Sequence, residues 1–417
     1  MILRIHNERQ PVGSLSTSKD GIRFSYDKAY VEAGGFPLSL SMPLRDEPFP
    51  ERTALPFFDG FLPEGEQRRE LSSFLHISST STMKLLGALA GECVGDLIVL
   101  EDGVSLEEAR QHDGYVPLDE SELEELLRPR SALRARFITQ RRLSLAGAQA
   151  KIGLYREGDG WFATTGLSPT THIIKPVSLF DPSILANEFF IMRLAHTCGL
   201  RVPAVDILHY GESYGLALER FDRRQSEAGI MRIGQEDFCQ ALSVMPAAKY
   251  ENDGGPGYAA VFGITARHTS PPLPSLRMLL KTVVFNFLIG NCDAHAKNFS
   301  LLRDPVTGTL SLAPAYDLLS TTYYGDRLLR SMAMAIGQHS VIDRVDDEDF
   351  ALFAKDTDIS LAAVTSEFAE LRTGLTKALD SIPKQLNDEA PVFAHDFYGL
   401  REHLLRELEA RHRILGG

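Results

Sequence analysis

The first hundred residues alternate between apolar and polar positions in short runs. Ile22, Phe24 and Tyr26 form one such run with a period of two. This period places successive side chains on opposite faces of a strand, so it predicts a short β-strand. Segments with helical spacing follow, in PFFDGFLPEGEQRRELSSFL and LLGALAGECVGDL. We therefore predict a β-rich module with packed helices over residues 1–102.

The next segment changes sign of charge within a few turns. An acidic stretch, LDESELEELL, predicts a helix over Leu118–Leu127, and six arginines follow between Arg128 and Arg142. We interpret residues 103–140 as a linker or helical connector. A run of arginines is most often a solvated face, although this one could contact phosphates.

From residue 143 the pattern predicts three strands, one helix and two more strands. The runs are LSLAGAQAKIGLY, WFATT, HIIKP, the amphipathic ILANEFFIMRLAHTCGL, VDILHY and GLALERF. Beyond residue 235 nearly every apolar run has helical spacing, with a single hairpin near residue 300. The chain is thus predicted to be α+β, with a sheet-rich segment at 141–222 and a helical segment at 223–417.

Composition narrows the possible classes of protein. With 417 residues, 44% of them hydrophobic and 24% charged, the chain is expected to fold into two or three domains. A net charge of −13 argues against a protein whose whole surface binds nucleic acid. The four cysteines lie far apart and indicate neither zinc nor disulfides. The start MILRIHNERQ lacks an apolar leader, and we expect a soluble, cytoplasmic protein without membrane contact.

Candidate chemistry is concentrated after a predicted core helix over Ser275–Ile289, which Ser275 could cap and Gly290 would end. The sequence continues with NCDAHAKNFSLL, the turn RDPVTG and TLSLAPAYDLLS, and the two apolar runs should pair as a hairpin. Its strands are of similar length. Asn298, before the first, and Asp317, after the second, should therefore meet at one end, near Asp293.

Three such oxygen-bearing side chains suit phosphoryl transfer. A carboxylate and an amide can hold Mg²⁺ while a second carboxylate accepts the proton of the attacking hydroxyl. Protein kinases use the same spacing, an aspartate, an asparagine five residues on and a later metal-binding aspartate. Taken singly, Asp293 would be a loop cap and Asn298 a turn residue. His295, in the same loop, could orient the loop, contact substrate or be purely structural.

A kinase site also needs groups for the nucleotide. Lys175 ends an apolar strand, where a lysine is costly unless paired, and Glu188 on the following helix is its candidate partner. A lysine whose amine simply reaches solvent is the alternative. The turn with Gly147 and Gly153 would let backbone amides approach phosphates. Residues 219–222 could form a hinge that contacts adenine, or a plain linker.

Several motifs together resemble the HipA family of bacterial serine/threonine kinase toxins. They are SLAGAQAK, THIIKP, ALERFDRR, QEDFCQA, KYENDGGPG, NFLIGNCDAHAKNFS and LAPAYDLLS, with PLSLSMPL near the start. The resemblance covers the chain. It implies a bilobal protein-kinase-like fold, with a β-rich N-lobe, an all-α C-lobe and an extra N-terminal β-rich subdomain.

The resemblance also implies roles for individual residues. Asp293 would be the catalytic base, with His295 beside it, and Asn298 and Asp317 would bind Mg²⁺. Glu188 would pair with Lys175. Ser144 would be an autophosphorylation site, and its phosphate would repel ATP and switch the kinase off. The residues expected to bind ATP are Ser144, Ala146, Gly147, Ala148, Lys175, Glu219, Phe221, Gln235 and Tyr316.

By the same resemblance the chain is expected to use ATP and Mg²⁺ and to inhibit growth by phosphorylating a translation component, such as an aminoacyl-tRNA synthetase. Its expected partner is a HipB-like helix-turn-helix antitoxin, through which it would reach DNA. Two alternatives stay open. One is a small-molecule or lipid kinase, and the other is a nucleotide-binding corepressor that holds the antitoxin on its operator.

Overall fold

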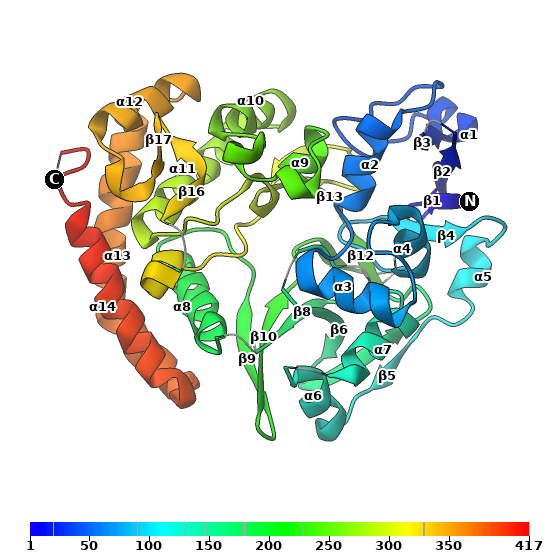
Figure 1. Cartoon of the computed structure of the whole chain (residues 1–417), viewed down its shortest axis with the longest axis horizontal. Coiled ribbons are helices and arrows are strands. Elements are labelled where there is room, and N and C mark those ends of the chain that lie inside the picture. Colours follow the sequence, from blue (N-terminus) through cyan, green and yellow to red (C-terminus); the bar gives the residue numbers. More distant parts are fainter. Residues whose placement is uncertain are drawn as a thin grey trace. The chain divides into compact units, whose positions relative to one another are not determined.

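The computed structural model describes the chain except residues 20, 90, 130, 144, 148, 178–180, 228, 328–329 and 417, and the side chains of 132, 326 and 327. By packing, the chain divides into two compact units (Figure 1). Unit 1 comprises residues 1–179, 208–247 and 302–308. Unit 2 comprises residues 180–207, 248–301 and 309–417. The division into four segments that the sequence predicts, 1–102, 103–140, 141–222 and 223–417, stays a prediction.

Unit 1 begins with an antiparallel sheet of four strands in the order β3-β2-β1-β4. Every second residue of β3 is buried, as its period of two predicts. Its elements are β1 (Ile2–His6), β2 (Pro11–Ser18), β3 (Gly21–Tyr26), α1 (Lys28–Glu32), α2 (Glu51–Asp59), α3 (Gly65–Phe74), α4 (Thr82–Leu89) and β4 (Ile98–Glu101).

A second sheet has six strands in the order β5-β7-β6-β8-β10-β9. The sequence predicted five strands, and this number was wrong, because β5 lies in the predicted connector. β5 is short, mostly exposed and ends in proline, so it carries no apolar alternation. The elements here are α5 (Leu106–Arg110), β5 (Gly114–Pro117), α6 (Glu120–Leu127), α7 (Ala132–Gln140), β6 (Ile152–Glu157), β7 (Gly160–Thr165), β8 (His172–Pro176), β9 (Val205–Tyr210) and β10 (Ser213–Glu219).

One hydrophobic core joins the two sheets of unit 1. Leu3 and Phe58 of the first region belong to the same buried cluster as Leu123, Ile152 and Ala217 of the second. The first hundred residues and the second sheet therefore fold as one packed body. The rest of this part of the chain forms β11 (Arg223–Ser226), β12 (Gly229–Arg232), β13 (Gly234–Asp237), α9 (Phe238–Ala241) and the short 3-10 turn η1 (Pro246–Ala248).

Unit 2 is mainly helical, and its longest helix, α13, packs side by side with α14 (Figure 1). Its elements are α8 (Ser183–Thr197), η2 (Glu251–Asp253), α10 (Tyr258–His268), α11 (Pro272–Ile289), η3 (Ala296–Asn298), the start of β14 (Ser300–Arg303), β15 (Leu310–Leu312), η4 (Thr321–Arg327), β16 (Ser331–Ile336), β17 (His339–Val341), η5 (Ile342–Arg344), α12 (Asp347–Asp356), α13 (Leu361–Glu389), η6 (Pro391–Phe393) and α14 (Ala394–Ala410). The last two residues of β14 belong to unit 1.

Unit 2 departs from the sequence pattern in two ways. A second hairpin, β16 with β17, accompanies the predicted one near residue 300, so the expectation of a single hairpin was wrong. Helix α11 starts at Pro272 rather than Ser275, because proline suits the first turn of a helix. Ser275 instead accepts a hydrogen bond from the N–H of Leu312 at 3.2 Å.

Helix α11 is also the one helix in the described part of the chain that is long and apolar enough to cross a membrane. In this structure 61% of that stretch is buried inside the protein. Phe285 and Leu288, for example, are both fully buried. This is the behaviour of a core helix.

Candidate active site

The loop that carries the predicted catalytic residues begins where α11 ends. Gly290 adopts a left-handed conformation with φ of 72°, which confirms the predicted end of the helix. Two residues later, the N–H of Cys292 donates to the Oγ1 of Thr321 at 2.8 Å. The carbonyl of Cys292 accepts from the N–H of Ala333, in β16, at 2.7 Å. The loop is thus anchored on both sides of its backbone just before Asp293.

Asp293 lies half-buried in this loop and is joined to Asn298 directly. The carbonyl oxygen of Asp293 accepts from the side-chain Nδ2 of Asn298 at 3.0 Å and from the N–H of His295 at 2.8 Å. Its carboxylate Oδ1 accepts from the phenol of Tyr250 at 2.8 Å. Because Asn298 donates with its nitrogen, its amide oxygen is the atom that can bind a cation. An amide oxygen beside carboxylates is a donor set that fits Mg²⁺.

His295 is buried in the same loop. Its ring meets that of Tyr250 edge to face, with centroids 5.5 Å apart and an interplanar angle of 79°. The structure therefore packs His295 against the side chain that contacts Asp293.

Asp317 follows the second strand of the predicted hairpin. Tyr316, the preceding residue, donates its phenol to the carbonyl of Lys297 at 2.6 Å and lies 2.6 Å from the Oγ of Ser300. The bond to Lys297 joins the residue before Asp317 to the residue before Asn298. The predicted meeting of Asn298 and Asp317 themselves stays a prediction. Asp317 has a positive φ of 58°, a conformation that aspartate tolerates better than most residues.

Helix α8 is fixed to the segment after Asp317. The side chain of Asn187, fully buried, donates to the carbonyl of Ser320 and accepts from its N–H, both at 2.9 Å. Its neighbour Glu188 is buried too. The predicted ion pair of Glu188 with Lys175 joins residues of different units and stays a prediction.

In unit 1, Lys175 is buried on β8, opposite Leu216 of β10. The turn expected to face phosphates begins nearby in sequence, at Ala146 and Gly147. Gly147 has φ of 108°, and its carbonyl accepts from the N–H of Glu64 at 2.9 Å. Ala146 accepts from the Nζ of Lys151 at 2.7 Å. Two predicted residues of this turn, Ser144 and Ala148, lie outside the described residues.

The predicted hinge begins at Glu219, the last residue of β10, and its residues alternate in exposure. Glu219 is exposed and Phe221 half-buried, whereas Arg220 and Asp222 are buried. The two residues expected to meet adenine are thus the more exposed ones of this segment, and Arg220 and Asp222 are the buried ones. Gln235, also expected at the site, lies half-buried on β13.

The buried side of the hinge ends in a cluster of charges centred on Glu92. Arg220, Arg223 and Arg232 all bind its carboxylate, with N–O distances of 3.3, 2.8 and 2.5 Å. Asp222 pairs with Arg220 at 2.7 Å. Burial alone would raise the pKa of Glu92, but the three arginines outweigh it and hold that pKa well below its usual range.

Three arginines of the run between β5 and β6 form hydrogen bonds inside the protein. Arg142 donates to the carbonyls of Gly87 and Val99 at 3.0 and 2.9 Å. Arg141 donates to Thr164 at 2.8 Å, and Arg134 to carbonyls at the end of α6 and just after it. For these three, internal hydrogen bonding replaces both expectations, a solvated face and contact with phosphates.

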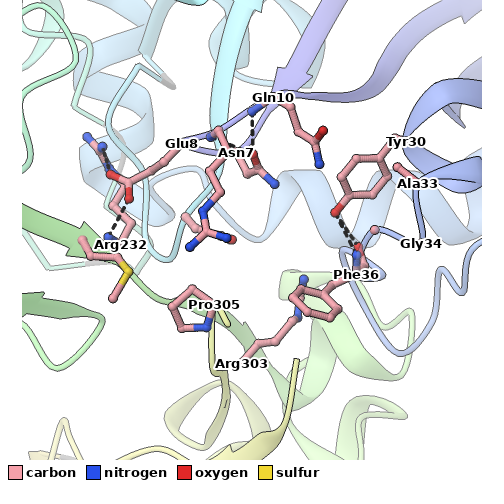
Figure 2. Close-up of a pocket in the computed structure, with 14 residues that line it drawn as sticks. Asn7, Glu8, Gln10, Tyr30, Ala33, Gly34, Phe36, Arg232, Arg303 and Pro305 are labelled. Carbon is pink, nitrogen blue, oxygen red and sulfur yellow. Dashed lines mark hydrogen bonds and ion pairs between the residues drawn. The ribbon is translucent and has the colours of Figure 1, made fainter. Parts of the chain in front are cut away.

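Unit 1 also contains a polar cavity of about 210 Å³ (Figure 2). It lies between the β1–β2 turn, the segment after α1, β12 and the tip of the β14–β15 hairpin. On one side Glu8 pairs with Arg232 at 2.7 Å, and on another the phenol of Tyr30 bonds to Phe36. The residues that line it include none of the predicted site residues.

Comparison with known proteins agrees with this architecture. The HipA-like C-terminal domain family matches residues 143–382, and the HipA N-terminal domain family matches residues 3–100. Y4mE of Sinorhizobium fredii is 36% identical, with 93% of each chain covered. The serine/threonine-protein kinase toxin HipA of Shewanella oneidensis is 28% identical over 95% of this chain and 93% of its own.

A solved structure extends the likeness to the fold. It is the complex of Shewanella oneidensis HipA with HipB and operator DNA, whose matched chain has a TM-score of 0.80 and 26% identity, with 98% of this chain and 99% of that one covered. The chain is thus a serine/threonine kinase with a bilobal, kinase-like α+β fold. It belongs to the HipA family.

Two residues of functional interest were not singled out from the sequence. Tyr250 lies in the motif KYENDGGPG, which contributed to the resemblance without a role for any of its residues. Glu92 carried no sequence signal, because a single glutamate in a glycine-rich segment does not reveal three arginine partners far along the chain.

Proposed function

We propose that this kinase transfers the γ-phosphoryl group of ATP to a serine or threonine hydroxyl, with Asp293 as the base. The observation that supports this most is the hydrogen bond from Asn298 to Asp293, together with the Tyr316–Lys297 bond, which joins the residue before Asp317 to the residue before Asn298. The bond from the hydroxyl oxygen to phosphorus forms, the β–γ bridging bond breaks, and Asp293 takes the hydroxyl proton.

Asn298 and Asp317 would hold Mg²⁺, which when bound neutralises charge on the phosphates. Lys175, Gln235 and the turn from Ser144 to Ala148 would bind phosphates, and Glu219 and Phe221 would hold adenine. Tyr316 would support this site through its bond to Lys297. These roles rest on the residue-by-residue resemblance and on the geometry within each unit.

The chain would act in the cytoplasm as the toxin of a toxin–antitoxin module. The solved relative was captured with HipB and operator DNA, which supports a HipB-like helix-turn-helix antitoxin as partner and contact with DNA through it. A translation component such as an aminoacyl-tRNA synthetase would be the protein substrate. Phosphorylation of Ser144 would add about −1.5 to −2 charge next to the ATP site and switch the kinase off.

Mass spectrometry of the intact chain and its peptides after incubation with Mg²⁺ and ATP tests the proposal. We expect one phosphate on Ser144 in the wild type, and none in Asp293→Ala or Ser144→Ala. Asp293→Ala should still bind ATP, whereas Asp317→Ala should lose affinity for Mg²⁺-ATP. Phosphate on Asp293→Ala at the wild-type rate would contradict the assignment of the base.

A further inference from the structure

Tyr250 is placed to control the carboxylate of Asp293. Its phenol donates to Oδ1 of Asp293 at 2.8 Å, and its ring packs edge to face with the ring of His295. A hydrogen bond to an ionised carboxylate is among the stronger ones in proteins. Tyr250 therefore restricts the rotation of the very group to which the proposed function assigns the proton.

The chain around Tyr250 is built to hold it there. The N–H groups of Asp253 and Gly255 both donate to the carbonyl of Tyr250, at 3.0 and 2.9 Å. Gly254 has φ of 87°. A Cβ on Gly255 would lie 2.4 Å from the carbonyl oxygen of Ala248 and 2.7 Å from that of Tyr250. The glycines of KYENDGGPG thus allow a turn too tight for other residues.

A second contact ties this turn to the catalytic loop. The carboxylate of Glu251 accepts from the N–H of Ala335 in β16 at 2.6 Å. The same strand donates to the carbonyl of Cys292 through Ala333, at 2.7 Å. Strand β16 therefore carries both the turn with Tyr250 and the residue before Asp293, so the two are held in register by one strand.

We propose that Tyr250 is a positioning residue that holds the Asp293 carboxylate in the orientation needed to accept the substrate proton. This inference rests on the proposed function, since it requires Asp293 to be the base. It assigns a role to the motif KYENDGGPG, namely to present a phenol to the catalytic carboxylate. Such a residue acts on the chemical step and not on nucleotide binding.

The test compares the full-length wild type with Tyr250→Phe, Asp293→Asn and the control Tyr398→Phe. Tyr398 lies on α14 with 47% of its surface exposed, so its variant removes a phenol away from the loop. Phosphate incorporation into the chain is followed from radiolabelled ATP with Mg²⁺ over a range of ATP concentrations. The readouts are the maximal rate, the ATP concentration that gives half of it, and the thermal midpoint.

We expect Tyr250→Phe to lower the maximal rate by on the order of tenfold, in line with the loss of one charge-assisted hydrogen bond. Its half-saturating ATP concentration and its thermal midpoint should stay at the wild-type values, as should all properties of Tyr398→Phe. A wild-type maximal rate in Tyr250→Phe, with Asp293→Asn inactive, overturns this inference and leaves the proposed function standing. An active Asp293→Asn, or a wild type without incorporation, overturns both.

Discussion

At the scale of single residues, Glu236 on β13 is a carboxylic acid that is almost completely buried from solvent. It is 2% exposed, and it accepts from the Oγ of Ser39 at 2.6 Å and from the N–H of Leu40 at 3.2 Å. Burial raises its pKa to about 7, although Ser39 and the nearby Arg303 counteract this. The loop PLSLSMPL of the first region is thus attached to β13 through a group that titrates near neutrality.

This setting predicts a stability that falls as pH rises. The pKa of Glu236 is higher in the folded chain than its ordinary 4.5. Between pH 4.5 and 7 the folded chain keeps a proton that the unfolded chain has released, so the free energy of unfolding declines by up to about 3 kcal/mol. Urea unfolding at pH 5 and pH 8 measures this decline, and Glu236→Gln should remove most of it. An equal decline in both proteins would refute the assignment.

Single residues differed in how far the sequence could reveal them. The contact between Asp293 and Asn298 was predictable from their five-residue spacing, and the place of Asp317 beside them stays a prediction from the hairpin. Tyr250 meets Asp293 across 43 residues of sequence, and Glu92 meets Arg220 across 128. No local pattern encodes such pairs, so only the packed chain shows them.

At the scale of elements, the turn around η2 links sequence to site. Its two central glycines differ in their demands: a Cβ on Gly254 would meet open space, whereas one on Gly255 would collide with backbone oxygens. Gly254 nevertheless has a positive φ. The turn therefore offers two glycines for comparison. A side chain at Gly254 would strain the backbone, and a side chain at Gly255 would collide with neighbouring backbone atoms.

We expect Gly255→Ala to displace the carbonyl of Tyr250 and to lower the maximal rate of phosphorylation together with the thermal midpoint. Gly254→Ala should cost only about 1 kcal/mol of stability, from its left-handed conformation, and should leave that rate near wild type. Autophosphorylation kinetics and thermal unfolding of both variants provide the comparison. Equal effects of the two would show that the turn does not position the loop.

Elements with a strong period were predictable and short ones were not. The end of α11 followed from a single glycine, and the strands β6, β7 and β8 from their apolar runs. The start of α11 and the strands β5, β16 and β17 did not follow. β16, SMAMAI, is a short run with most residues buried, and such a run cannot be told from part of a helix by periodicity.

At the scale of the whole molecule, the first hundred residues pack into the same compact unit as the second sheet. They share its hydrophobic core, and they supply Glu92 to Arg220, Arg223 and Arg232. The sequence predicted a β-rich module with packed helices over residues 1–102, and its bounds stay a prediction. The buried charges depend on contacts among distant segments, which only the folded chain reveals.

Glu92→Ala should therefore destabilise the protein strongly. It leaves three buried arginines without their common carboxylate, and removing one partner of a buried pair typically costs about 3–5 kcal/mol. The control Glu107→Ala removes an exposed glutamate of α5 and should change stability by less than about 0.5 kcal/mol. Urea unfolding at neutral pH measures both, and a loss below about 1 kcal/mol for Glu92→Ala would contradict the argument.

Glu92→Ala should also weaken ATP binding, because Arg220 lies between Glu219 and Phe221 in the sequence, the two residues expected to hold adenine. If the cluster fixes the hinge, Glu92→Ala weakens ATP binding at a temperature where the chain is still folded, and Glu107→Ala does not. Calorimetric titration with Mg²⁺-ATP, with folding checked by circular dichroism, separates the two variants. Unchanged affinity in a destabilised Glu92→Ala would show that the first hundred residues stabilise the kinase without shaping its adenine site. Weakened affinity for ATP would show that the first hundred residues also shape the adenine site, because Glu92 binds the arginines of the hinge.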